Sequence, residues 1–178
     1  MKKIMAAVAI AAALALTGCS SPAPTVGAGK AADAAVKETA VADRSAALGE
    51  TVTYDGGIAV TVASAGYLAA GQYASGAIEG QEAVFELTVK NGSEKELNAA
   101  LMSLPKVTYG DKNAKAASVI DTANGIGMDM LSTILPGETA TVKFAAAVPA
   151  AEAGVVRVEV SGPNMITDKA AIFKGAIK

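Results

Sequence analysis

The stretch DTANGIGMDM, residues 121–130, holds the densest group of potential metal ligands in the sequence. Asp121, Asn124 and Asp129 lie there among glycines, and carboxylate and amide oxygens are ligands that Ca²⁺ prefers. Their spacing differs from the D-x-[DN]-x-[DN]-G pattern of EF-hand loops. We therefore favour an ordinary glycine-rich loop between strands, with a metal site at this loop as the alternative.

Met128 and Met130 flank Asp129, and their thioether sulfurs are soft ligands suited to Cu(I). The chain contains no histidine, and no other methionine lies close enough in the sequence to complete such a site. Packing of both methionines in a core or a loop is therefore the favoured interpretation.

The missing residue types also restrict catalysis. A chain without histidine has no His-based triad, no His general base and no His metal ligand. Glu79 and Glu82 lie close together in a glycine-rich stretch, where solvated surface charges explain them better than a catalytic pair. We expect no catalytic residue and no cofactor, and hence a protein that is not an enzyme.

The single cysteine, Cys19, follows a segment with the composition of a secretion signal. Two lysines precede an uncharged apolar run over residues 4–16. As a helix, this run would be about 20 Å long, shorter than the ~30 Å hydrocarbon core of a bilayer. A membrane-spanning anchor is therefore not expected.

The tetrapeptide LTGC, residues 16–19, resembles the lipobox of bacterial lipoproteins. The resemblance implies cleavage between Gly18 and Cys19 and attachment of diacylglycerol to the cysteine sulfur. Two acyl chains hold a protein on a membrane, because each buried CH₂ contributes about 0.8 kcal/mol. We predict a lipoprotein signal peptide over residues 1–18 and a lipid anchor at the outer face of the cell membrane. An ordinary cleaved signal with a chance cysteine is the alternative.

Charge excludes some partners. Cleavage after Gly18 removes two lysines and no acidic residue, so the net charge changes from −2 to −4. A weakly acidic chain without a basic cluster argues against nucleic-acid binding and against attachment to anionic lipid by charge. Because the only cysteine is assigned to lipid, stability must come from a hydrophobic core rather than from disulfides.

Residues 19–47 form the region between the predicted signal and the predicted domain. They begin with Ser and Pro, become Ala-rich and contain no aromatic residue. We predict the lipidated cysteine followed by a flexible tether whose ends lie roughly 30 Å apart. A short helix docked on the domain is the alternative.

From residue 48 to 178, apolar and polar residues alternate with a period of two, which is typical of half-buried strands. Phe85 and Phe144 fall on the faces expected to point inward. No helix-length amphipathic run interrupts the pattern. The sequence therefore predicts an immunoglobulin-like antiparallel β-sandwich of about seven to eight strands. Strands are expected within 50–54, 58–67, 83–92, 106–111, 116–121, 135–149, 154–162 and 169–177.

The connection GYLAAGQYASGAIEGQE, residues 66–82, is longer than a hairpin turn. Tyr67, Leu68, Tyr73 and Ile78 stand there among small residues. Packing of the loop over the end of the sandwich is the favoured interpretation. Loops on a rigid scaffold often carry function, and Tyr is favoured in recognition, so we predict that any partner contact involves these four residues.

Five segments resemble, in order, landmarks of the small bacterial lipoproteins that carry the domain of unknown function 4352. They are LGETVTYDGGIAVTV, FELTVKNGS, LPGETATVKFAAAVP, VVRVEVSG and AAIFKGAI. The resemblance spans residues 48–177 and implies an immunoglobulin-like, telokin-like sandwich. The family has no established catalytic residues, so none is carried over.

These observations together predict a membrane-anchored, extracytoplasmic binding or interaction module. Its expected partners are the membrane, through Cys19, and an unknown extracytoplasmic protein or envelope component. A metal-ion sensor or carrier that uses the 121–130 loop is the alternative, and a structural envelope protein without a small ligand is the third possibility.

Overall fold

The computed structural model describes residues 25–28 and 44–178. The predicted signal peptide, the cleavage site and Cys19 lie outside the described residues. Two strands, β1 (Thr25–Ala28) and β2 (Ser45–Ala47), fall within the range predicted as a tether. Over the described residues, no helix has the length and apolar character needed to cross a membrane.

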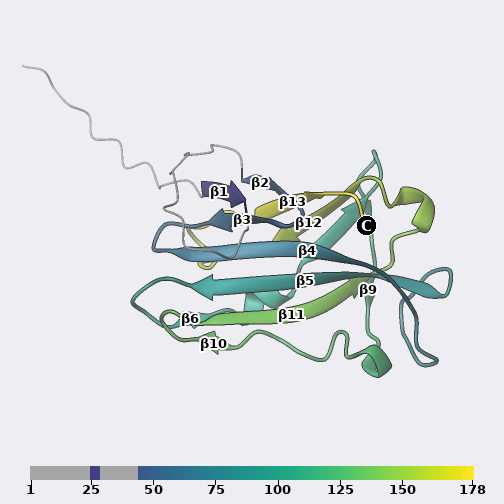
Figure 1. Cartoon of the computed structure of the whole chain (residues 1–178), viewed down its shortest axis with the longest axis horizontal. Coiled ribbons are helices and arrows are strands. Elements are labelled where there is room, and N and C mark those ends of the chain that lie inside the picture. Colours follow the sequence, from purple (N-terminus) through teal and green to yellow (C-terminus); the bar gives the residue numbers. More distant parts are fainter. Residues whose placement is uncertain (1–24, 29–43) are drawn as a thin grey trace, which may run out of the picture.

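Two β-sheets packed face to face form the domain (Figure 1). The first sheet has the order β1, β3 (Glu50–Thr53), β4 (Ile58–Ala69), β5 (Gln81–Asn91), β11 (Thr139–Ala146) and β9 (Ser118–Val119). The second has the order β2, β13 (Ala171–Gly175), β12 (Val156–Val160), β7 (Lys106–Tyr109) and β8 (Ala114–Lys115). A small ladder joins β6 (Leu97–Asn98) to β10 (Thr133–Ile134).

Strand pairs in both sheets are antiparallel except for β2 and β13, which run parallel. Three short 3₁₀ helices complete the described elements: η1 (Ala100–Ser103), η2 (Thr122–Asn124) and η3 (Ala150–Glu152). The predicted β-sandwich is thus confirmed. The predicted 116–121 strand is reduced to the two residues of β9, and most of the 135–149 segment forms β11.

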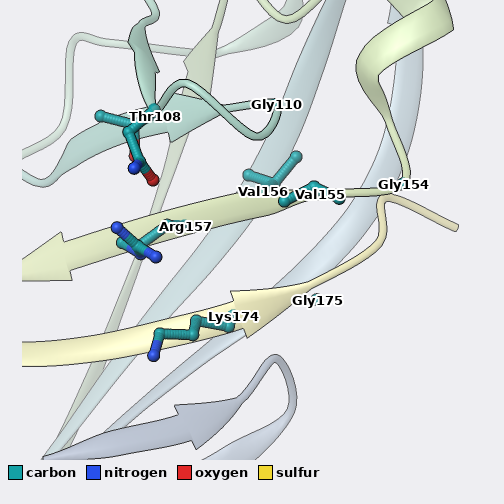
Figure 2. Close-up of a pocket in the computed structure, with 9 residues that line it drawn as sticks. Thr108, Gly110, Gly154, Val155, Val156, Arg157, Lys174 and Gly175 are labelled. Carbon is teal, nitrogen blue, oxygen red and sulfur yellow. The ribbon is translucent and has the colours of Figure 1, made fainter.

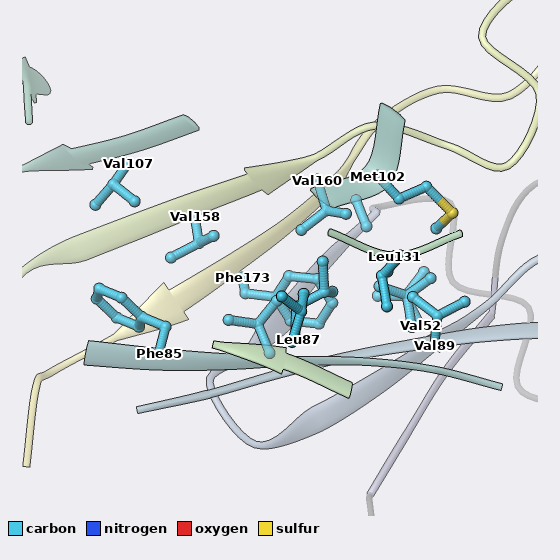
Figure 3. Packing of buried hydrophobic residues seen from close by; sticks show 14 of the residues in the cluster. Val52, Phe85, Leu87, Val89, Met102, Val107, Leu131, Val158, Val160 and Phe173 are labelled. Atoms are coloured by element: carbon cyan, nitrogen blue, oxygen red, sulfur yellow. The ribbon is translucent and has the colours of Figure 1, made fainter. Parts of the chain in front are cut away.

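Alternation along the long strands builds the main core. Phe85, Leu87 and Val89 of β5 are fully buried and face side chains of the second sheet such as Val158 and Phe173 (Figure 3). Burying a side chain of this size contributes roughly 1.5–3 kcal/mol, so these residues carry a large part of the stability.

Phe144 of β11 points inward as predicted, and its ring stacks on that of Phe85 with the centroids 5.3 Å apart. It is only half-buried, however, because β9 reaches no further along β11 than Ala145 and Ala146. The aromatic pair therefore forms the border between the core and an open side of the sandwich.

A second, smaller core lies on the outer face of the first sheet. Val84, on the opposite side of β5 from Phe85, packs with Val119, Ile126 and Ala145. The 70–80 connection and the 117–127 segment therefore cover this face, and β5 is buried on both sides near its start.

Asn91 ends β5 and is fully buried. Its amide nitrogen donates hydrogen bonds to the carbonyl oxygens of Lys95 and Ile134, both at 2.8 Å, and its amide oxygen accepts from Ser93. Buried polar groups need such partners. Asn91 therefore ties β5 to the loops that follow it and to β10.

Candidate functional site

A cavity lies where the edges of the two sheets meet, and we call it the Phe144 cavity. Its volume is about 350 Å³, near the lower end of the range typical of ligand pockets. Phe144 and Ala146 line it from β11, Val107 lines it from β7, and Met130 comes from the loop before β10. Four segments contribute to it: residues 103–107, 115–120, 127–130 and 143–146.

The position of this cavity follows from the topology. The chain leaves the second sheet at β8 and enters the first sheet at β9, so residues 115–118 bridge the two edges. β9 pairs only with Ala145 and Ala146, so at Phe144 the edge of β11 that faces away from β5 has no paired strand among the described residues. Ser118 lies opposite Ala146, and directly opposed residues share a face, so Ser118 also faces the space between the sheets.

Three lysines and one aspartate line the Phe144 cavity. Lys106 pairs with Glu159 at 3.2 Å, and Lys143 lies 3.8 Å from Glu86, whereas Lys115 has no ion pair with another described residue. Asp129 is exposed. Because Lys106 and Lys143 are already paired, the lining charges without an ion pair among the described residues are one cation, Lys115, and one anion, Asp129.

The predicted metal ligands do not come together as a set. Asp121 and Asn124 are neighbours, but Asp129 lines the Phe144 cavity instead. The oxygens of Asp121 accept from the backbone N–H groups of Gly71, Ala123 and Asn124 and from the Asn124 side chain. These bonds lower the pKa of Asp121, the Gly71 bond most of all, while burial opposes them. The carboxylate oxygens of Asp121 are thus already occupied by hydrogen-bond donors rather than available to a metal ion.

Asp121 therefore has a structural role. It is the N-cap of η2, and by accepting a hydrogen bond from the Gly71 N–H it connects the 70–80 connection to the 117–127 segment. Among the described residues, no group of three or more His, Cys, Asp or Glu side chains is placed to hold a metal ion. Met128 and Met130 are both exposed, so of the two expected places, a core or a loop, they lie in the loop.

Glu82 corrects another expectation. It lies within β5 and is fully buried, rather than solvated in a loop, whereas Glu79 is exposed. Neither carboxylate oxygen of Glu82 has a hydrogen-bond partner among the described residues. Burial, followed by the charge of Asp121, raises the pKa of Glu82, and the Asn124 amide acts in the opposite direction.

The four residues predicted to contact a partner divide into two groups. Tyr73 is 83% exposed and Leu68 is 41% exposed. Tyr67 packs against the main core and donates a hydrogen bond to the Pro149 carbonyl at 3.3 Å, and Ile78 packs against the second core. β4 extends to Ala69, so the connection proper is residues 70–80.

Solved structures share this fold. A proposed lipoprotein, ycdA, from Bacillus subtilis is 17% identical, with a TM-score of 0.52, and the match covers 67% of this chain and 36% of that one. The yjhA protein from the same organism is 16% identical, with a TM-score of 0.52 over 72% of this chain and 97% of that one. An uncharacterized β-sandwich protein from Clostridium difficile is 17% identical, with a TM-score of 0.47 over 79% and 99%.

The chain is thus a β-sandwich protein with counterparts in bacteria, and at these identities the likeness shows the fold alone. No protein-family model and no curated protein sequence matches it. The resemblance to the domain of unknown function 4352 therefore stays a prediction.

The sequence analysis missed the Phe144 cavity and the burial of Glu82. The cavity is lined from four separate segments, so no local pattern indicates it. For Glu82 one signal existed: it directly precedes the apolar run AVF at the start of β5.

Proposed function

We propose that this protein is a lipid-anchored, extracytoplasmic binding module that catalyses no reaction and holds a small, partly apolar ligand in the Phe144 cavity. The observation that carries the proposal is a space of about 350 Å³ against the exposed part of an aromatic ring. Its apolar floor suits the apolar body of a small ligand, and Lys115, which has no ion pair with another described residue, provides one cation for an anionic head.

The lipobox at residues 16–19 supports the anchored part of the proposal. The neighbour ycdA, itself a proposed lipoprotein, is consistent with it. We also propose that the chain belongs to the family with the domain of unknown function 4352, on the five segments that resemble it.

Hexanoate provides a defined probe for the cavity, since it joins a short apolar chain to one negative charge. We expect hexanoate to cause saturable shifts of the backbone amide resonances of Val107, Phe144 and Ala146. Ser118→Trp places an indole between the sheets and should abolish these shifts. Thr139→Trp, at the other end of β11, is the matched control and should leave them unchanged.

Two results would contradict the proposal. One is the absence of any saturable shift at the cavity residues in the wild-type protein. The other is equal hexanoate binding by the Ser118→Trp variant with the wild-type fold retained.

A further inference from the structure

A separate hollow of about 120 Å³ lies on the outer face of the second sheet, over β7, β12 and β13 (Figure 2). Arg157 and Lys174 line it from the neighbouring strands β12 and β13 (Figure 2). Gly154 and Gly175 form part of the wall.

Strand register sets the charges of this hollow. Arg157 lies directly opposite Lys174 on β13 and directly opposite Thr108 on β7, and Lys115 of β8 lies opposite Thr108. One row across four strands therefore carries three cations and no acidic residue. Like charges that face each other across a ladder destabilise it, so a bound anion would stabilise this row.

The neighbouring row of the same sheet shows the ordinary arrangement. There Lys106 lies opposite Glu159, and the two side chains form an ion pair at 3.2 Å. Arg157 and Lys174 have no ion pair with any described residue. Glu152 approaches the adjacent turn at Gly110 but pairs with neither cation.

The guanidinium of Arg157 provides a second, independent observation. Its Nε is buried and has no hydrogen-bond partner among the described residues. An unsatisfied buried donor on a charged group is costly. Nε itself is closed to solvent, so a bound anion would contact the terminal nitrogens of the guanidinium, a group that presents parallel N–H donors to the oxygens of a phosphate or carboxylate.

We propose that this hollow binds a phosphate group between Arg157 and Lys174, with the Thr108 hydroxyl as a neutral donor. The tetrahedral oxygens of a phosphate can be contacted from different directions by Arg157, Lys174 and Thr108, whereas a carboxylate offers two oxygens in one plane. The site is separate from the Phe144 cavity and does not depend on the proposed ligand there.

Inorganic phosphate, titrated at constant ionic strength with chloride as the exchanged anion, tests the site. We expect saturable shifts of the amide resonances of Gly154 and Gly175 and of the Arg157 Nε–H resonance. Arg157→Gln and Lys174→Gln should each weaken binding by about tenfold or more, the loss expected for one charge-assisted hydrogen bond. Lys90→Gln, which removes an exposed strand lysine from the other sheet, is the matched control and should bind as the wild type does.

A second arm separates a free phosphate from a phosphate carried by a lipid. Vesicles of phosphatidylglycerol and of phosphatidylcholine are compared, with the soluble Cys19→Ala protein. Binding to phosphatidylglycerol that requires Arg157 and Lys174 assigns the site to a lipid headgroup. Saturable binding of inorganic phosphate alone assigns it to a free phosphate.

The proposal is overturned if neither phosphate nor phosphatidylglycerol binds, or if the Arg157→Gln and Lys174→Gln proteins, folded as the wild type, bind equally well. Acetate binding as tightly as phosphate through the same two residues would overturn the choice of phosphate.

Discussion

Glu82 is a single carboxyl group whose surroundings connect stability to pH. Its raised pKa means that the folded protein holds a proton that the unfolded chain releases at lower pH. The folded state therefore binds more protons than the unfolded state between the ordinary Glu value, about 4.5, and the raised value. By linkage, stability falls as pH rises through that interval.

Glu82→Gln removes this titration. We expect the melting temperature of the variant to decline less than that of the wild type as pH rises above about 4.5. Asp121, whose pKa is lowered, acts in a more acidic interval, where stability is lost as pH falls, so the two effects are separable. Parallel pH profiles of wild type and variant, followed by circular dichroism, would contradict a raised pKa at Glu82.

Strands are the elements that the sequence predicts best, and the reason is physical. The alternation of Phe85, Leu87 and Val89 with Glu86 and Thr88 requires a strand with one face buried, and β5 is that strand. Short edge strands such as β8 and β9 have two residues each and no pattern to detect. The position of the Phe144 cavity depends on where these short strands end. Local sequence patterns therefore could not predict the cavity.

The same limit applies to the cationic row. Lys115, Arg157 and Lys174 are far apart in the sequence, and the chain has no basic run. Antiparallel register brings them together across four strands. The sequence analysis therefore excluded a basic cluster that the sheet creates.

Phe85 and Phe144, the stacked aromatic pair, differ in burial. Replacing each by alanine therefore distinguishes a residue of the core from a residue that lines the cavity. Phe85→Ala should cost about 3–5 kcal/mol of unfolding free energy, the range for a fully buried aromatic. Phe144→Ala should cost less, about 1–3 kcal/mol, because part of its ring is already exposed. Urea unfolding measures both, and equal losses would contradict the open side of the sandwich.

Tyr73 tests the connection between β4 and β5 as a contact surface. Because its side chain is 83% exposed, Tyr73→Ser should leave the melting temperature unchanged. If this connection contacts a partner, crosslinks on intact cells should be lost at that unchanged stability. Tyr67→Ser is the comparison, and it should lower stability because that ring packs on the core. Retained crosslinks in the Tyr73 variant would place the contact elsewhere.

The predicted lipid on Cys19 attaches the whole molecule to the membrane. We expect Cys19→Ala to release the protein from the membrane or to leave an uncleaved precursor, because the acyl acceptor is lost. Membrane fractionation with and without detergent distinguishes these forms. A mature Cys19→Ala protein that still requires detergent for extraction would contradict the lipid anchor.

The central claim for the whole molecule is that the open side of the sandwich is a ligand site. A crystal structure of the mature chain grown with hexanoate tests it most directly. We predict electron density for the acyl chain against Phe144 and Met130, between β8 and β11. A structure in which side chains close this space, or in which hexanoate binds only at other positions, would contradict the claim.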